Sequence, residues 1–441
     1  SMDMDFTVKT LGECRIKTPL HLSKVKGDGI YDFVEDGERV LYSSSLREVM
    51  TAMKNGENLV SFEKPGPKEL IYFEPAKTKV AIVTCGGLCP GLNNVIRGLV
   101  THLYNRYGVT NIVGVQYGYA GLNPDLQIPF IDLNPDLVDD IHKDGGSMLA
   151  SSRGQQPYEI IVDTLERNNI NILFCVGGDG TLKGAHGIYK EIEKRGLKIA
   201  VAGVPKTIDN DINLIEKSFG FESAFTAAQS IILNAHYEAK GAINGVALVK
   251  LMGRDSGFIA ANVALAVPDV NFCLIPEMDF DLDNPETQNG FLNLLEKRLE
   301  RKKHAVVVVA EGAGQQFFQG ERKKDASGNV LHEDIGVYMK NQITEYFNKK
   351  NIPICVKYID PSYIIRSIPA NANDSKFCEQ LTHNAVHAAM AGRTDFVVGY
   401  WNGSFTLLPI EAATAQRKKV NLEGEFWWSV VEATGQPLVM K

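Results

Sequence analysis

Residues 171–181, NILFCVGGDGT, decide the fold of this chain. The first six residues form a short apolar run that predicts a buried strand, and a helical pattern follows over 181–195. A strand that passes through a glycine-rich turn straight into a helix is the start of a βα unit. Such units build parallel sheets that helices cover on both faces.

The same rhythm continues on both sides of this stretch. Further strands are predicted at 80–84, 112–116, 198–204, 245–251, 272–275, 304–310 and 355–359. Further helices are predicted at 92–105, 157–167, 222–239, 257–266, 285–301, 334–348 and 375–391. We therefore expect an α/β protein with two doubly wound, mainly parallel-sheet domains.

Residues 1–78 are polar and rich in turns, so we expect an N-terminal extension there. The first α/β domain is expected at 79–220, completed by about 368–410, and the second at 221–367, completed by about 411–441. A chain of 441 residues with 44% hydrophobic and 22% charged residues has ample core, which excludes a disordered chain. The net charge of −7 gives no positive field that would recruit nucleic acid or an anionic membrane.

Localisation is expected to be cytoplasmic. No apolar run approaches the roughly 18 residues of a membrane span, and we expect no signal peptide. The seven cysteines are scattered, which fits a reducing compartment. The nearest pair, Cys85 and Cys89, has no second pair beside it, so zinc is not expected.

Chemistry is expected just after each strand, because ligands of open α/β sheets bind beyond the carboxyl ends of the strands. Gly177, Gly178 and Gly180 would let backbone approach a phosphate at the N-terminus of the next helix. Asp179 among them suits Mg²⁺, which takes carboxylate and phosphate oxygens. A tight βα turn without a ligand is the plainer interpretation of the same glycines.

The segment Pro205–Asp211, PKTIDND, follows the next strand. It places two carboxylates, Asp209 and Asp211, beside a lysine and a threonine hydroxyl. One carboxylate could take the proton of a sugar hydroxyl as a general base. The alternative is an Asx-rich turn that caps the next element.

Three later segments carry charge at further strand ends. Arg254 in MGRDSG (252–257) could clamp a phosphate or pair with Asp255. Glu311 follows the strand at 304–310, and Lys357, Tyr363 and Arg366 lie within ten residues of one another. The polar insertion at 315–330 is predicted to be a solvated surface loop, with a lid or a subunit contact as the alternative. The basic runs at 301–303 and 417–419 are predicted to be solvated faces near helix ends rather than binding patches.

Together these segments resemble the 6-phosphofructokinases, specifically the long-chain ATP-dependent type of plants and protists. The resemblance covers roughly residues 79–435. It runs through Gly86-Gly87 with Pro90–Asn94, Gly145–Ser147 with Arg153-Gly154, GGDGT, PKTIDND, MGRDSG, Glu311-Gly312 and the Tyr363-x-x-Arg366 pair, in family order.

The resemblance implies that MgATP phosphorylates the 1-hydroxyl of fructose 6-phosphate, the committed step of glycolysis. Asp209 would be the general base, with Thr207, Arg254 and Lys206 as further catalytic residues. Asp179 would hold Mg²⁺, and Asp211 would support it. The ATP site would comprise Gly87, Arg153, Gly154, Gly178, Asp179, Gly180 and Thr181. The fructose 6-phosphate site would comprise Thr207, Ile208, Asp209, Met252, Gly253, Arg254, Glu311, Lys357, Tyr363 and Arg366.

Lys357 matches an arginine that reaches the 6-phosphate from a neighbouring subunit in this family. The resemblance therefore implies a homotetramer, with a homodimer as the alternative. The chain departs from the short bacterial form at Leu88, where that form has Asp, at Gly245, where it has an inter-subunit Arg, and at Tyr363, where it has His. These departures argue against transferring the allosteric properties of the short enzymes.

The phosphoryl donor is marked by two positions that point in opposite directions. Pyrophosphate-dependent members usually have Asp after the metal-binding Asp and Lys before the Thr of TIDND. Here the first position is Gly180, which favours ATP, and the second is Lys206, which favours pyrophosphate. We give Gly180 more weight, because an Asp there would put bulk and negative charge where the α-phosphate of ATP must lie. A pyrophosphate-dependent enzyme is the alternative.

Two other functions compete. GGDGT also occurs in NAD kinases and lipid kinases, although TIDND and MGR argue against that class. A silent regulatory subunit is expected to have lost Asp179 or Asp209, and both are present.

Overall fold

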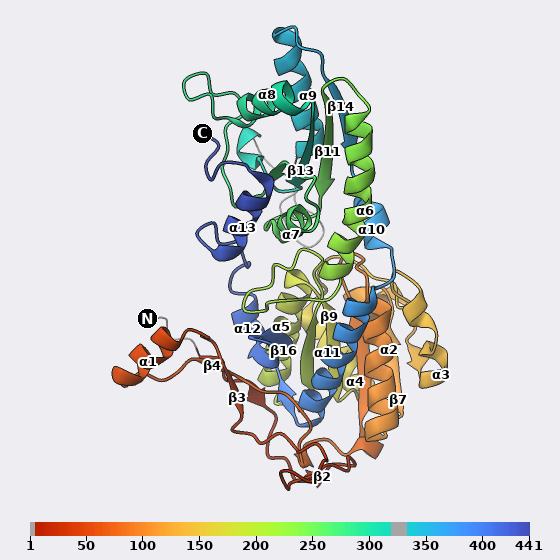
Figure 1. The fold of residues 1–441 in the computed structure, drawn as a ribbon. Coiled ribbons are helices and arrows are strands. Elements are labelled where there is room, and N and C mark those ends of the chain that lie inside the picture. The colour runs from red at the N-terminus through yellow and green to blue at the C-terminus, as the bar shows by residue number, and fades with distance from the viewer. Residues whose placement is uncertain (1–4, 319–332) are drawn as a thin grey trace.

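The computed structural model describes residues 5–318 and 333–441. Two lobes, each built on its own β-sheet, stack one above the other (Figure 1). The first lobe surrounds a nine-stranded sheet and the second a four-stranded sheet. The insertion predicted at 315–330 falls largely outside the described residues; its start forms a short 3₁₀ turn, Gln315–Phe317.

The first sheet has a parallel centre and antiparallel edges. Its order is β3 (Arg39–Leu41), β4 (Ser61–Glu63), β17 (Ser404–Pro409), β16 (Phe396–Trp401), β10 (Ala200–Pro205), β9 (Ile172–Gly177), β6 (Lys79–Thr84), β7 (Asn111–Val115) and β8 (Ile131–Leu133). The five strands from β16 to β7 run parallel, while β8 and β17 pair antiparallel with their neighbours. Strands that are buried on both faces explain the continuous apolar runs in the sequence.

Successive side chains of a strand point to opposite faces, and β6 shows this directly. Val80 and Ile82 pack into one core with α2 (Leu92–His102) and α11 (Ala372–Met390). Ala81 and Val83 pack into another core with α4 (Tyr158–Arg167) and α5 (Asp179–Lys194). Helices α2 and α11 lie side by side on one face of the sheet (Figure 1), and α4 and α5 cover the other face.

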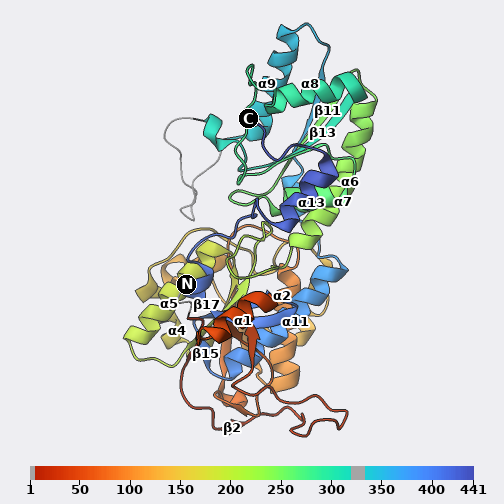
Figure 2. The ribbon, with the colours of Figure 1, turned by 60° about the vertical axis from the view of Figure 1, so that its left-hand side comes forward.

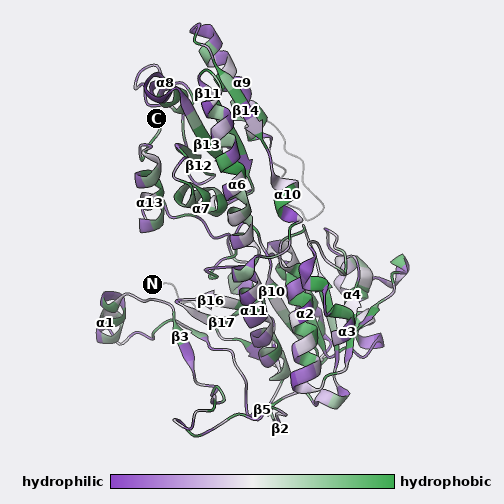
Figure 3. Ribbon diagram, turned by 45° about the vertical axis from the view of Figure 1, so that its right-hand side comes forward, coloured by the Kyte–Doolittle hydropathy of each residue, from purple (hydrophilic) through white to green (hydrophobic). Residues whose placement is uncertain are grey.

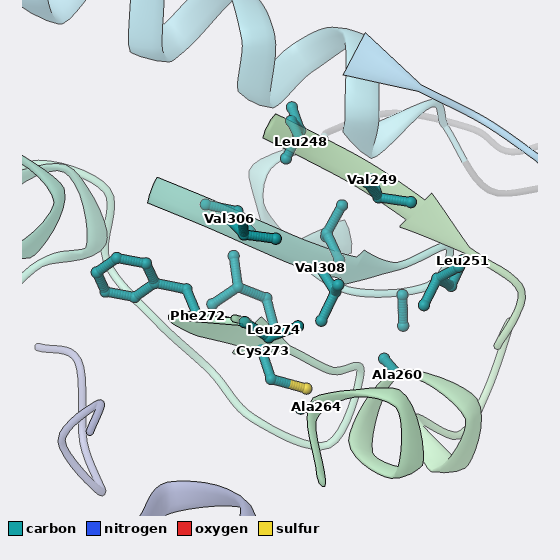
Figure 4. Close-up of a cluster of buried hydrophobic side chains, with 14 of the residues drawn as sticks. Leu248, Val249, Leu251, Ala260, Ala264, Phe272, Cys273, Leu274, Val306 and Val308 are labelled. Carbon is teal, nitrogen blue, oxygen red and sulfur yellow. The ribbon is translucent and has the colours of Figure 1, made fainter. Parts of the chain in front are cut away.

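The second sheet is wholly parallel, in the order β12 (Phe272–Leu274), β13 (His304–Ala310), β11 (Gly245–Leu251) and β14 (Cys355–Ile359). Its helices are α6 (Phe221–Lys240), α7 (Phe258–Ala266), α8 (Phe291–Lys302), α9 (Ile335–Lys349) and α13 (Glu425–Thr434). Val306 and Val308 meet Leu274 and Ala260 in a continuous apolar core (Figure 4). Burying each such valine or leucine contributes roughly 1.5–3 kcal/mol.

The N-terminal segment packs on the first lobe. Strand β1 (Lys9–Thr10) pairs with β15 (Arg393–Thr394), β2 (Ile16–Lys17) pairs with β5 (Leu70–Ile71), and β3 and β4 extend the large sheet. Phe6 stacks on the buried Phe62, with ring centroids 4.7 Å apart. Helix α1 (Leu46–Lys54) buries no residue and stands away from the first lobe in Figure 1; the turned view of Figure 2 brings it to the front. The proposed domain boundaries remain predictions.

The predicted α/β fold class, with two mainly parallel sheets and helices around them, is confirmed. Strands 245–251, 304–310 and 355–359 have the predicted bounds. The helix predicted at 285–301 begins only at Phe291, because Asn284 forms an Asx turn that accepts hydrogen bonds from the N–H groups of Glu286 and Thr287. Apolar residues concentrate inside both lobes (Figure 3). None of the described helices combines the length and apolarity needed to span a bilayer.

Three short α-helices connect main elements: α3 (Pro135–Val138), α10 (Ser362–Arg366) and α12 (Ile410–Ala413). Further single turns are a π-helical segment at Leu103–Tyr107 and 3₁₀ turns at Pro75–Lys77, Gly118–Leu122, Pro124–Leu126 and Ile141–Lys143.

Candidate active site

A cleft lies where the carboxyl ends of β6, β9 and β10 of the first lobe meet those of β11 and β13 of the second. It is lined by Gly86, Gly87, Leu88, Cys89, Arg153, Gly178, Asp179, Gly180, Thr181, Lys206, Thr207, Ile208, Asp209, Asp211, Arg254, Glu311, Arg366 and Arg417. The glycine turn after β9 and the acidic segment after β10 therefore share one cavity. This shared cavity is the arrangement that transfer of a group between them requires.

The turn after β6 brings two cations close to the backbone. Gly86 adopts a φ of 86°, in the left-handed region, and the Lys206 ammonium donates a hydrogen bond of 2.7 Å to the carbonyl of Gly87. A Cβ on Gly87 would lie 2.7 Å from a guanidinium nitrogen of Arg153. A side chain at 87 would therefore displace the end of the Arg153 side chain from its place in the cleft. Burial lowers the pKa of Lys206, and Arg153 lowers it further.

The turn after β9 leads directly into α5, and Asp179 is the first residue of that helix. The helix starts two residues earlier than the sequence indicated, so Asp179 lies in the first turn, beside free backbone N–H groups. A Cβ on Gly177 would collide with the Thr181 side chain at 2.3 Å, so the tight turn needs a glycine. A helix N-terminus with exposed glycines is a suitable phosphate site.

The segment after β10 is held by its own side chains. Asn210 has a left-handed φ of 55°; its side chain accepts from the N–H of Ser218 and donates to the carbonyl of Glu216. The Thr207 hydroxyl donates to Asp211 at 2.9 Å. These bonds hold the segment in place, but the predicted cap on the next element is not present, because Gly220 is the N-cap of α6 and makes no side-chain hydrogen bond there.

Asp209 lies where the two lobes meet. Its Oδ2 accepts a hydrogen bond of 3.3 Å from the backbone N–H of Arg254. Burial, Asp211 and Glu311 together raise the pKa of Asp209 to about 7, while the Arg254 N–H and Arg366 act in the opposite direction. A carboxyl whose pKa lies near neutrality is well suited to accept a proton in catalysis.

The second lobe fixes Arg254 through backbone contacts. The N–H of Gly312 donates to the carbonyl of Gly253 at 2.9 Å, and that of Glu311 donates to the carbonyl of Leu251 at 2.8 Å. A Cβ on Gly312 would lie 1.7 Å from the carbonyl oxygen of Arg254. Glycine at 312 therefore allows the ends of β11 and β13 to close on each other and to present Arg254 and Glu311 together.

Five of the proposed site residues do not line the cleft of this chain. Met252 and Gly253 are buried behind it, and Gly154 follows Arg153 in the loop with a φ of 100°. Lys357 is exposed on the edge strand β14, and Tyr363 is 86% exposed on α10. Arg366, three residues further on the same helix, does reach the cleft.

The departures from the short bacterial form have local structural correlates. Leu88 lines the cleft. Gly245 begins β11, and a Cβ there would lie 2.0 Å from the carbonyl oxygen of Ala239. An arginine at 245 is therefore incompatible with this packing.

Arg417 was missed by the sequence analysis, and the prediction that 417–419 is solvated surface is wrong for its first two residues. Arg417 pairs with Asp211 at 2.8 Å and lies 3.6 Å from Asp179. Lys418 is largely enclosed: its ammonium donates to the carbonyls of Ile215 and Glu216. Burial lowers the pKa of Lys418 to about 7. The sequence at 417–419 has no periodicity or motif that distinguishes a cleft-lining arginine from ordinary exposed basic residues.

Comparison with known proteins agrees with this geometry. Residues 79–389 match the phosphofructokinase family. The chain belongs to the phosphofructokinase family. It is 54% identical to the ATP-dependent 6-phosphofructokinase of Borreliella burgdorferi, over 100% of this chain and 98% of that protein. It is 45% identical to the protein of the same name from Amycolatopsis methanolica, over 98% of this chain and 95% of that one.

Solved phosphofructokinase structures share the fold. The pyrophosphate-dependent phosphofructokinase of Marinobacter aquaeolei aligns with a TM-score of 0.65 at 20% identity, covering 82% of this chain and 92% of that one. The Pichia pastoris phosphofructokinase in the T-state aligns with a TM-score of 0.61 at 22% identity, covering 77% of this chain and 35% of that one. At these identities the likeness shows the fold alone.

Proposed function

We propose that this phosphofructokinase transfers the γ-phosphoryl group of MgATP to the 1-hydroxyl of fructose 6-phosphate, giving fructose 1,6-bisphosphate and ADP. The observation that carries the proposal is the shared cleft, in which Asp209 and Asp179 face a set of cations from both lobes. Phosphoryl transfer needs positioning and neutralisation of charge more than covalent chemistry. Relatives named ATP-dependent 6-phosphofructokinase, aligned over nearly their full length, support the same activity.

Each part of the cleft has a role in this proposal. The turn at Gly86–Gly87, with Arg153, and the turn at 178–181 bind the phosphates of ATP. Arg254, Glu311 and Arg366 hold the sugar phosphate from the second lobe. Asp209 takes the proton of the 1-hydroxyl as the oxygen attacks the γ-phosphorus, and Lys206 stabilises the charge that develops on the transferred group.

The oxygen ligands available for Mg²⁺ lie at the phosphate-binding end of helix α5. Asp179 offers a carboxylate at the phosphate-binding helix terminus, and Mg²⁺ is usually held by one or two carboxylates together with substrate phosphates. The described residues contain no group of three or more potential ligands that could hold a metal alone. We therefore assign Mg²⁺ to Asp179 and the nucleotide together, where it would neutralise phosphate charge.

ATP is the proposed donor rather than pyrophosphate. Gly180 is exposed at the start of α5, and its lack of a side chain leaves space beside Asp179 for the α-phosphate. Lys206 is compatible with either donor. The test is a comparison of ATP with pyrophosphate, using fructose 6-phosphate and Mg²⁺. Turnover with pyrophosphate alone would overturn the assignment of the donor.

A homotetramer, with a homodimer as the alternative, belongs to the same proposal. Lys357 and Tyr363 are exposed outside the cleft of their own chain, as residues that complete a neighbour's site would be. Analytical ultracentrifugation at enzyme concentrations used for assay tests this. A fully active monomer would contradict it. The cytoplasmic localisation also remains a prediction.

A further inference from the structure

The backbone of Lys418 is bonded to both lobes of the protein. Its N–H donates a hydrogen bond of 2.9 Å to the carbonyl of Asp211, two residues after Asp209 in the first lobe. Its carbonyl accepts a hydrogen bond from the hydroxyl of Ser256, two residues after Arg254 in the second lobe. The two peptide groups that flank one residue therefore join the segments that provide the proposed base and the proposed sugar-phosphate arginine.

The side chain of Lys418 makes the same connection a second time. Its ammonium donates to the carbonyl of Ile215 at 2.6 Å and to that of Glu216 at 3.1 Å, both in the first lobe. The same ammonium lies 4.8 Å from the centroid of the Phe258 ring, at the start of α7 in the second lobe. A cation over an aromatic face is attracted by the electrons of the ring. Lys418 therefore contacts each lobe through both its backbone and its side chain.

A second link runs beside the first. The N–H of Val420 donates to a carboxylate oxygen of Glu277 at 2.7 Å. Glu277 also accepts a hydrogen bond of 3.0 Å from the N–H of Gly257, the last residue of the MGRDSG loop (252–257). This loop is therefore attached to the chain at both Lys418 and Val420.

The charge of Lys418 is not needed to fill the space between the lobes. Moving an ammonium out of water costs free energy, and an apolar side chain of similar length would pack here without that cost. The cost is visible in the pKa of Lys418, which burial lowers to about 7. What the ammonium adds is direction, because its N–H groups bind two carbonyls of the first lobe while its charge lies over a ring of the second. The side chain therefore sets how the two lobes lie against each other.

We propose that Lys418 is a positioning residue for phosphoryl transfer. It holds the segment that carries Asp209 and the loop that carries Arg254 at the separation at which the N–H of Arg254 bonds to Oδ2 of Asp209. A reacting group displaced by about 1 Å can lose about 10²-fold in rate. This inference rests on the proposed function, because Lys418 acts through the proposed base.

Lys418→Met tests the proposal, because methionine keeps an apolar side chain beside Phe258 but removes the bonds to the two carbonyls. With MgATP and fructose 6-phosphate, kcat is expected to fall at least about tenfold, while the KM for MgATP changes by less than about twofold. In an Asp209→Ser background the same substitution should lower kcat by less than about threefold, because the base through which Lys418 acts is already absent. An equal loss in both backgrounds would overturn the proposal, as would an unchanged kcat in Lys418→Met alone.

Hydrogen exchange of the nucleotide-free, full-length protein gives a readout that needs no activity. Peptides that cover residues 250–258 should exchange at least about tenfold faster in Lys418→Met, because the two segments then separate more often. The matched control is Lys217→Met. Lys217 also lies over an aromatic ring, that of Phe377 at 4.4 Å, but it pairs with Glu222, outside the loop 252–257. Exchange over 250–258 should be unchanged in the control, and an equal acceleration there would overturn the proposal.

Ser256→Ala breaks the same link from the second lobe by removing a single hydroxyl. It should accelerate exchange over 250–258 by about threefold or more, and it decides the question if Lys418→Met does not fold. Unchanged exchange in Lys418→Met, or in Ser256→Ala where that variant alone folds, would refute the positioning role. Failure of the proposed function would appear separately, as an Asp209→Ser enzyme that retains the kcat of the wild type.

Discussion

The backbone N–H of Arg254 donates a hydrogen bond to Oδ2 of Asp209 across the junction of the two lobes, at 3.3 Å. The bond joins the end of β10 to the end of β11, so the proposed base and the proposed sugar-phosphate residues form one unit. Movement of one lobe against the other would change the hydrogen bonding and position of Asp209. The geometry of Asp209 is therefore a property of both lobes.

Replacing Asp209 with Ser is expected to lower kcat by about 10²–10⁴-fold, the usual contribution of a general base. The KM for fructose 6-phosphate should change much less, because Arg254, Glu311 and Arg366 keep their positions. Steady-state kinetics with MgATP check this, and Asp125→Ser, at an exposed aspartate outside the cleft, is the control. A large rise in KM with kcat intact would contradict the role of base.

Activity is expected to fall in acid because the base must be ionised. The pKa of Asp209 is raised to about 7, so the carboxyl is protonated below that pH. The acid limb of kcat/KM should therefore drop by about tenfold per pH unit below roughly pH 7. A pH profile of the wild type measures it. A limb that breaks only near pH 4, the ordinary value for Asp, would rule out this environment.

The same raised pKa predicts a gain in stability for Asp209→Asn. In the unfolded chain Asp ionises near pH 3.9, whereas in the folded protein it ionises at about 7, so folding becomes less favourable as the pH rises between these values. The variant should melt a few degrees higher than the wild type at pH 8, and the difference should vanish toward pH 4. Thermal unfolding at the two pH values checks this, with Asp125→Asn as control.

Gly180→Asp is expected to impair the use of ATP. The added carboxylate would stand beside Asp179 at the helix terminus, where it repels the α-phosphate. The kcat/KM for ATP should fall by about 10²-fold or more, the effect of roughly 3 kcal/mol, with a smaller change for pyrophosphate. Gly37→Asp adds the same charge at an open, exposed position and should leave both donors unaffected. An unchanged kcat/KM for ATP would remove Gly180 as a determinant of the donor.

A buried histidine cluster between α2 and α11 is expected to make the protein sensitive to acid. His102 stacks on His383 at 4.4 Å, and its Nε2 is buried without a hydrogen-bond partner. Burial lowers the pKa of His102 to about 2 and that of His387 to about 3. Both histidines protonate near pH 6.5 when unfolded, so the stability present above pH 6.5 is lost progressively below it.

His102→Leu should flatten this dependence, because one of the two groups no longer takes up a proton on unfolding. The expected change is up to about 1.4 kcal/mol per pH unit between pH 6 and 4, visible in urea denaturation. His21→Leu, at an exposed histidine, is the control. Equal pH slopes for His102→Leu and the wild type would show that the cluster does not govern acid stability.

Strands and glycine turns were predictable because their signals are local. The apolar runs of β11 and β13 gave the bounds of these strands, since strands buried on both faces leave an uninterrupted pattern in the sequence. Helix α8 was mispredicted at its start, because the Asx turn at Asn284 competes with helix formation over the preceding residues.

The site was predictable where it follows a strand end. Asp179, Asp209, Arg254 and Glu311 each lie within four residues after the end of a β strand, and all four line the cleft. Tyr363 was expected beside Arg366 in the sugar-phosphate site, but three residues along the short helix α10 turn its side chain outward in this chain. Whether a neighbouring subunit receives it depends on an assembly that local sequence does not specify.

The sequence by itself determined the two α/β lobes, the phosphate turns and the identity of the acidic pair, because short-range periodicity and residue chemistry suffice for them. Only the tertiary structure placed Arg417 against Asp211, 206 positions away along the chain. That contact depends on residues 417–420 bridging the two lobes: the N–H of Lys418 donates to the carbonyl of Asp211 in the first, and the N–H of Val420 donates to Glu277 in the second. Such a contact forms only when segments far apart in the chain pack together, so the local sequence of three basic residues does not predict it.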